Sequence, residues 1–175
     1  MAAESRLGKQ LEEIVATLGS IGAPFALIGG LALAPYKVIR ATQDIDFLTD
    51  ASTFDAVHEA LSGLGYKCLH RSADAGNYLR GDERVDFILA HRPAALRLLR
   101  NAKPLETNFG PLQIVSVEGL IGLKLQAFVN NVRRHQDLED IRALIRANPD
   151  TIDMEEVRRY FQLFERESLL EQLME

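Results

Sequence analysis

The sequence predicts an α/β (α+β) fold: a small mixed sheet flanked by helices, followed by a C-terminal helical part. A short apolar segment at 25–28 ends in a pair of glycines, and two further strand-length apolar segments carry acidic residues. In the last third of the chain, the apolar residues recur only at helical spacing. We therefore expect an α/β core over 1–110 and a helical part over 111–175 that packs on it.

The first elements follow from apolar spacing and turn residues. Apolar residues between 7 and 18 lie at helical spacing, and the glycines and proline of 19–24 end this helix. We then expect a buried strand over 25–28, a turn at Gly29-Gly30 and a helix over 31–39. The following elements are, in order, a strand over 44–48, a helix that starts with a capping box at 52–55 and ends at Gly65, a strand over 66–70 and a hairpin of 77–80 with 84–90.

The remaining chain is mostly helical. Pro93 suits the first turn of a helix that runs to about residue 99. We expect, in order, a turn at 108–111, a last strand over 112–115, helices over 117–131 and 135–147, and one long final helix that starts with a capping box at 153–156.

Composition limits the function classes. The net charge is −5, with 20 Lys+Arg against 25 Asp+Glu, which argues against a protein that coats nucleic acid, although residues 133–135 form a local basic group. The single cysteine, Cys68, has no internal partner, which fits a reducing compartment and predicts a cytoplasmic protein. The start of the chain has no signal-peptide pattern, and no apolar run is long enough to cross a bilayer, so we expect no membrane association.

Three aspartates stand in apolar frames. Strand side chains alternate between faces, so Asp44 and Asp46 point one way while Ile45 and Phe47 point into the core, and Asp86 is framed in the same manner. Three carboxylates on one surface repel one another unless a cation neutralises them, and oxygen ligands of this kind suit Mg²⁺. The alternative is a solvated strand edge that needs no metal.

The glycine pair allows two interpretations. Gly29 and Gly30 follow a strand and precede a predicted helix, so their backbone could approach a phosphate at the positive end of that helix. A tight turn without a ligand would use the same residues.

Several charged side chains are candidates for nucleotide contacts. Arg40 precedes the acidic pair and would hold a triphosphate bidentately, or it is a surface residue at a helix end. Lys124 lies among the apolar residues of its helix, where it either reaches a nucleotide phosphate or snorkels to solvent. Asp137 and Asp140 share a helix face and either orient Lys124 or Arg133 or are solvated acids near the helix start.

These motifs resemble the nucleotidyltransferase superfamily with the polymerase-beta-like fold. The resemblance rests on the segments Ile28-Gly29-Gly30, Asp44-Ile45-Asp46-Phe47 and Val85-Asp86-Phe87.

A second set of residues, Arg40-x-Thr42, Lys124 and Asp137-x-x-Asp140, is similar to AbiEii-type toxin nucleotidyltransferases and their small uncharacterised relatives. Those relatives often have Lys-Asp where this chain has Gln136-Asp137. Small aminoglycoside-type nucleotidyltransferases share the length and the first motif.

The resemblance implies Mg²⁺-dependent transfer of a nucleoside monophosphate from an NTP to an acceptor hydroxyl or phosphate. It implies that Asp44 and Asp46 bind one Mg²⁺, and that Asp86 binds a second and helps to deprotonate the attacking group. The nucleotide-binding residues would be Gly29, Gly30, Arg40, Thr42, Lys124 and Asp137.

The resemblance is compatible with two acceptors, RNA as for a toxin-like enzyme or a small molecule such as an aminoglycoside. It also implies an antitoxin-like protein as a partner. The alternative is a catalytically idle relative that binds a nucleotide or a partner protein, either as an antitoxin-like or as a structural module.

Overall fold

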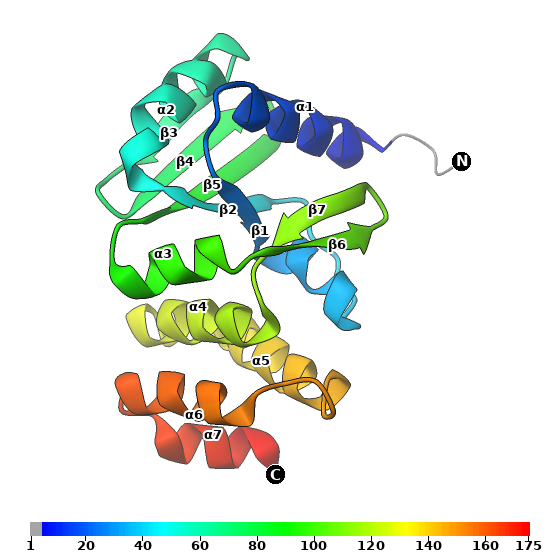
Figure 1. Cartoon of the computed structure of the whole chain (residues 1–175), viewed down its shortest axis with the longest axis vertical. Helices are drawn as coiled ribbons and strands as arrows, with labels where there is room; N and C mark the ends of the chain where they lie inside the picture. Colours follow the sequence, from blue (N-terminus) through cyan, green and yellow to red (C-terminus); the bar gives the residue numbers. More distant parts are fainter. Residues whose placement is uncertain (1–4) are drawn as a thin grey trace. The chain divides into compact units, whose positions relative to one another are not determined.

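The computed structural model describes residues 5–175, which form two units (Figure 1). Of the described residues, the α/β unit holds 5–32 and Arg40–Val115. The helical unit holds Leu33–Ile39 and Ser116–Glu175. The observed boundary thus falls after the last strand rather than at residue 110, and a short early segment belongs with the helices. The packing of the helical part on the core stays a prediction.

The α/β unit is built on a mixed sheet of seven strands in the order β3-β4-β5-β2-β1-β7-β6. The strands are β1 (Phe25–Ile28), β2 (Ile45–Asp50), β3 (Lys67–Arg71), β4 (Ala75–Arg80), β5 (Glu83–Ala90), β6 (Lys103–Thr107) and β7 (Gly110–Ile114). The pairs β2–β5 and β1–β7 are parallel, and the other pairs are antiparallel. The predicted fold class, a mixed sheet with helices, is confirmed.

Three α-helices belong to this unit: α1 (Arg6–Ser20), α2 (Phe54–Gly63) and α3 (Pro93–Arg100). The side chain of Ser5 caps α1 by accepting a hydrogen bond from the Gly8 N–H. As predicted, Pro93 stands at the start of α3, where its missing N–H costs no helical hydrogen bond. Helix α3 packs against β2 and β5, the two strands that contain Asp46 and Asp86.

The core of the α/β unit lies directly behind those acidic motifs. Phe47 and Phe87 are buried, with ring centroids 5.7 Å apart, and Phe54 of α2 packs on Phe87 at 5.6 Å. Asp46 and Asp86, one residue before each buried ring, are only partly buried. The predicted alternation along both strands is therefore present, and it anchors the acidic residues to a rigid apolar layer.

The helical unit consists of α4 (Val117–Asn130), α5 (His135–Ala147), α6 (Met154–Leu163) and α7 (Glu167–Met174). Helix α4 packs against both α5 and α6. The segment Leu33–Ile39 joins this unit through Asn148, whose Nδ2 donates to the Tyr36 carbonyl oxygen at 2.9 Å. Among residues 5–175, no helix is long and apolar enough to cross a bilayer.

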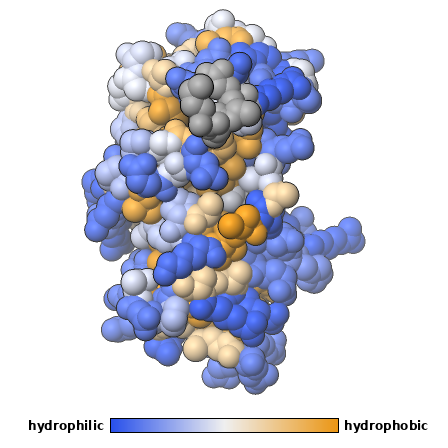
Figure 2. Space-filling model, turned by 90° about the vertical axis from the view of Figure 1, so that its right-hand side faces the viewer, coloured by the Kyte–Doolittle hydropathy of each residue, from blue (hydrophilic) through white to orange (hydrophobic). Residues whose placement is uncertain are grey.

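Apolar side chains reach the surface only in scattered places. Figure 2 shows a face on which hydrophilic residues predominate and hydrophobic ones form small separate patches. The largest exposed fractions belong to Ile39 at 93%, Leu163 at 69% and Val132 at 58%. Single exposed apolar residues of this kind are common in globular proteins and need no partner.

Two predicted helices are wrong. The segment 31–39 forms two short 3₁₀ turns, η1 (Gly30–Ala32) and η2 (Ala34–Tyr36), because Pro35 supplies no N–H and Lys37 adopts a left-handed φ of 65°. The predicted long final helix is divided into α6 and α7 by Glu165, which has a φ of 55°.

Two smaller expectations also differ from the structure. Strand β6 was not expected, although the turn at 108–111 between it and β7 is present, with Gly110 at a φ of 90°. The capping box expected at 52–55 is absent: Asp50 caps a 3₁₀ turn over Ala51–Thr53 by accepting a hydrogen bond from the Ser52 N–H at 2.8 Å, and Thr53 precedes α2 without a side-chain cap. By contrast, the predicted cap at Asp153 is present, because its side chain accepts from the N–H groups of Glu155 and Glu156.

Candidate active site

The structure places two of the predicted aspartates, Asp46 and Asp86, on adjacent strands, and the third, Asp44, immediately before one of these strands. Asp46 and Asp86 are direct register partners in the parallel pair β2–β5, where Cα atoms on neighbouring strands lie about 5 Å apart. Register partners point to the same face, which is opposite to the buried Phe47 and Phe87. Asp44 is exposed and stands immediately before β2, two residues from Asp46.

Two side chains fix the carboxylate of Asp86. Asn77 of β4 lies opposite Asp86 in the antiparallel pair β4–β5, and its Nδ2 donates to Asp86 Oδ1 at 2.8 Å. Arg84 stands two residues before Asp86 on β5, and its Nε donates to Asp86 Oδ2 at 2.9 Å. Both oxygens of this carboxylate therefore accept a hydrogen bond from the protein.

The negative charges of all three aspartates act on the Arg84 guanidinium. Its pKa is raised, first by the hydrogen bond to Asp86 and by the charge of that carboxylate, and further by the charges of Asp44 and Asp46. The side chain of Arg84 is 45% exposed, whereas that of Asp86 is 20% exposed. Sequence reasoning did not identify Arg84 or Asn77 as site residues. The only signal for Arg84 is its spacing of two residues from Asp86, and the only signal for Asn77 is a polar residue on the strand that precedes β5 in the hairpin.

The glycine pair lies against the acidic segment. Ile28 at the end of β1 pairs with Asp46 of β2, so the next residue, Gly29, reaches the aspartate side chain. Gly29 has a φ of +71°, and a Cβ added to it would stand 2.3 Å from Asp46 Oδ2. Only glycine combines this backbone conformation with this close approach. Gly30 is similarly close to Thr42, whose Cβ would be 3.0 Å from an added Cβ.

The expected helix behind the glycine pair is absent. Gly30 begins the three-residue turn η1 rather than an α-helix. An anion site built on a helix dipole at this point is therefore not supported, and only the close approach of the glycine backbone remains. Arg40 is partly buried and lies four residues before Asp44. The nucleotide contacts expected from Gly29, Gly30, Arg40 and Thr42 stay predictions.

Lys124 and Asp137 belong to the helical unit, where they join a buried ionic cluster. Lys124 Nζ lies 2.7 Å from Asp140 Oδ2 and 3.5 Å from Asp137 Oδ1. Asp137 also accepts from Arg134 Nε at 2.6 Å, and Asp140 accepts from Gln136 Nε2 at 3.0 Å. The two aspartates are 5% and 2% exposed, so they orient Lys124 and are not solvated acids. A contact of Lys124 or Asp137 with a nucleotide stays a prediction.

The donor set of the α/β unit suits a hard divalent cation in its chemistry, because carboxylate oxygens are what Mg²⁺ binds. Among residues 5–175, however, no set of three or more His, Cys, Asp or Glu side chains is already arranged to hold a metal ion. Asp86 accepts one hydrogen bond on each oxygen, from Asn77 and from Arg84, and each oxygen keeps a second lone pair that a cation could approach. The residues therefore fit the ion in kind.

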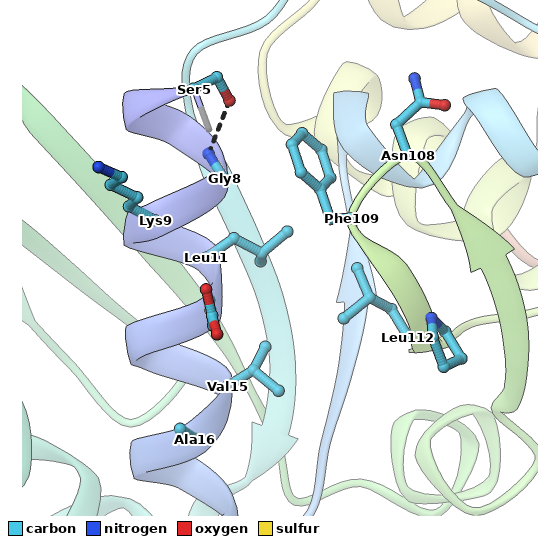
Figure 3. A pocket seen from close by; sticks show the side chains of 11 residues that line it. Ser5, Gly8, Lys9, Leu11, Val15, Ala16, Asn108, Phe109 and Leu112 are labelled. Carbon is cyan, nitrogen blue, oxygen red and sulfur yellow. Dashed lines mark hydrogen bonds between the residues drawn. The ribbon is translucent and has the colours of Figure 1, made fainter. Parts of the chain in front are cut away.

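A separate cavity of about 630 Å³ lies between α1 and the β6–β7 hairpin. Figure 3 shows Leu11 and Val15 of α1 facing Phe109 and Leu112 of the hairpin region across this space. None of the predicted site residues lines it. The cavity is mostly apolar and is distinct from the carboxylate cluster.

Comparisons with known proteins bear on the fold. No protein-family model matches the sequence, and neither does a curated protein. Solved structures do match. The antibiotic-resistance factor ANT(2'')-Ia in solution superposes with a TM-score of 0.69 at 18% identity, and the match covers 97% of each chain.

The same resistance factor in complex with adenylyl-2''-tobramycin matches with a TM-score of 0.69 at 16% identity, over 92% of this chain and 98% of that one. The lincosamide antibiotic adenylyltransferase LnuA, bound to lincomycin, matches with a TM-score of 0.54 at 15% identity, over 78% and 96% of the two chains. At these identities the likeness concerns the fold. It agrees with the motif resemblance, and we conclude that this chain has the nucleotidyltransferase fold.

Proposed function

We propose that the protein is an enzyme, a Mg²⁺-dependent nucleotidyltransferase that moves a nucleoside monophosphate from an NTP to an acceptor. The observation that carries this proposal is the register pairing of Asp46 with Asp86 on β2 and β5, with Asp44 two residues away. This cluster lies in a fold shared with an adenylyltransferase over most of both chains. A cluster of like charges is costly for a module that binds no cation, which argues against a catalytically idle relative.

The residues divide the work as follows. Asp44 and Asp46 would hold Mg²⁺, and Asp86 would hold a second ion and help to deprotonate the acceptor. The ion supplies positive charge that neutralises and orients the triphosphate. The backbone of Gly29, which already lies against Asp46, would cradle a phosphate together with Gly30. Apart from the proton transfer to Asp86, these groups would act by position and charge.

A small cationic molecule is the acceptor that the observations favour. Two of the similar structures were solved with antibiotic-derived molecules, adenylyl-2''-tobramycin and lincomycin. The net charge of −5 also attracts a cation more than it attracts RNA. An RNA acceptor with an antitoxin-like partner remains the second candidate, because the motif around Arg40 and Thr42 is similar to toxin nucleotidyltransferases.

The test is transfer of label from each α-labelled NTP in the presence of Mg²⁺. The acceptors offered are aminoglycosides, lincosamides and total cellular RNA, and pyrophosphate release is measured in parallel. We expect label on one acceptor class and a loss of at least about a hundredfold in Asp46→Asn. Asp82→Asn is the matched control, since Asp82 is an exposed acid of the same unit that pairs only with Arg6 among the described ion pairs.

The outcomes separate the candidates. Label on RNA alone would favour the toxin-like function over the antibiotic-modifying one. Calorimetric binding of an NTP without pyrophosphate release, with every acceptor, would identify an idle nucleotide-binding relative. Unchanged transfer by Asp46→Asn would contradict the assignment of the site.

A further inference from the structure

The carboxylate cluster contains a cation of its own. Arg84 donates from Nε to Asp86 Oδ2 at 2.9 Å, and the charges of Asp44 and Asp46 act on the same guanidinium. Arg84 and Asp86 are two residues apart on β5, so they lie on the same face of the sheet as Asp46. Arg84 therefore balances part of the negative charge of this cluster.

A divalent ion at this cluster competes with Arg84. Two cations a few ångströms apart repel strongly, because the interaction energy rises inversely with their distance. Of the two groups that bind Asp86, Asn77 is neutral and forms its bond across the ladder of β4 and β5. Arg84 is charged and 45% exposed, so its side chain has solvent to move into. Of these two partners, Arg84 is therefore the one that a nearby divalent ion displaces more readily.

This inference rests on the function proposed above. We propose that Arg84 is a resident counter-cation that pairs with Asp86 and balances part of the charge of Asp44 and Asp46 in the metal-free protein, and that it releases Asp86 when a divalent ion binds. Arg84 is thus a positioning residue: it weakens metal binding and keeps the empty carboxylate cluster stable. A metal ion therefore binds at this site only when it competes successfully with Arg84 for Asp86.

The test measures metal binding without nucleotide. Mg²⁺ affinity is determined by calorimetry and Mn²⁺ affinity by electron paramagnetic resonance for the wild type, Arg84→Met, Arg84→Lys and Arg100→Met. Arg100→Met is the matched control, because it removes one exposed positive charge from the same unit at the end of α3, away from the β5 ion pair.

We expect Arg84→Met to bind both ions about tenfold more tightly, because the competing charge and its hydrogen bond are gone. Arg84→Lys retains the charge and should lie between the two, and Arg100→Met should stay within about twofold of the wild type. A second readout is the melting temperature. Metal-free Arg84→Met should have a lower melting temperature than the wild type, and added Mg²⁺ should raise its melting temperature by more than it raises that of the wild type.

The failures are distinguishable. If Arg84→Met and the wild type bind Mg²⁺ equally well, the role of Arg84 is refuted while the proposed function stands. If the wild type and both Arg84 variants bind neither Mg²⁺ nor Mn²⁺ without nucleotide, this inference fails, whereas the proposed function is refuted only by the absence of label transfer in the presence of NTP and Mg²⁺. Should Arg84→Met not fold, the comparison of Arg84→Lys with the wild type decides: equal affinities and melting temperatures would overturn the proposal.

Discussion

Replacement of Gly29 by alanine probes how closely the glycine turn and the acidic cluster are joined. The added Cβ would stand 2.3 Å from Asp46 Oδ2 and 2.8 Å from the Cβ and Cγ atoms of the same side chain. Contacts this short do not occur between non-bonded atoms, so either the turn or the carboxylate must move. Because Asp46 emerges from a paired central strand with buried neighbours, its movement disturbs the cluster directly.

Two costs add up in Gly29→Ala. The φ of +71° costs an L-residue about 1–2 kcal/mol, and relief of the clash costs about 1–3 kcal/mol more, which gives roughly 2–5 kcal/mol in the free energy of unfolding. Gly81→Ala is the matched control. Gly81 has a similar φ of +63° in the turn between β4 and β5, but no atom lies within 4 Å of its added Cβ. It should therefore lose only about 1–2 kcal/mol.

Urea unfolding followed by circular dichroism measures both variants, and calorimetry with Mg²⁺ measures their sites. We expect Gly29→Ala to be less stable than Gly81→Ala by about 1–3 kcal/mol and to bind Mg²⁺ more weakly, whereas Gly81→Ala binds it like the wild type. Equal stabilities for the two variants, or wild-type Mg²⁺ affinity in Gly29→Ala, would refute the close packing of the turn on Asp46.

Three further predictions concern the helical unit, apart from one control in α1. Lys124→Met leaves two buried aspartates without their shared cation and should lower the free energy of unfolding by about 3 kcal/mol or more in urea titrations; an unchanged midpoint would contradict this. Gly122→Ala places a Cβ 2.9 Å from the Tyr160 ring and should cost about 1–3 kcal/mol, whereas Gly19→Ala, with no atom within 4 Å, should cost nothing or stabilise α1. Burial, and secondarily the charge of a neighbouring glutamate, raises the pKa of Tyr36 to about 12. Because the folded state holds this proton more tightly, its contribution to stability is complete below pH 10 and is lost between about pH 10 and 12; after discounting for partial exposure we expect a loss of about 1–2 kcal/mol relative to Tyr36→Phe, measured by urea unfolding at each pH.

The acidic strands could be predicted because their pattern is local. Apolar residues on both sides of Asp46 and Asp86 mark buried strands, and the period of two places the carboxylates on the opposite face. The pairing of the two strands follows from the fold that the motifs resemble. The acidic strands could therefore be predicted because the apolar residues next to each aspartate indicate a buried strand.

Arg84 and Asn77 could not be predicted in the same way. A charged or polar side chain on the exposed face of a strand has the same local pattern whether it is solvated or bound to a partner. Its partner is set by strand register, which pairs Asn77 with Asp86 across two strands and leaves Arg84 one step away on the same face. Such contacts become visible only with the sheet assembled.

The errors in the helices have a similar origin. The apolar pattern continues through 31–39 and through the C-terminal segment. In 31–39, Pro35 was a signal against a helix that the apolar spacing outweighed, and Lys37 adds a left-handed φ. In the C-terminal segment the left-handed residue is Glu165, and because it is not glycine its residue type does not indicate the end of a helix. Strand β6 was missed because it lies at the sheet edge, mostly exposed, where alternation is weak and Pro104 argues against a strand.

The central claim is that Asp44 and Asp46 hold a divalent ion, and that Asp86 lies beside them to hold a second. A crystal structure with Mn²⁺ and a non-hydrolysable NTP tests it most directly, because the anomalous signal of manganese locates the ion independently of the protein atoms. We predict a peak within about 2.2 Å of oxygens from Asp44 and Asp46 and of the triphosphate, with Arg84 released from Asp86. A bound nucleotide with its metal away from these carboxylates would contradict the account.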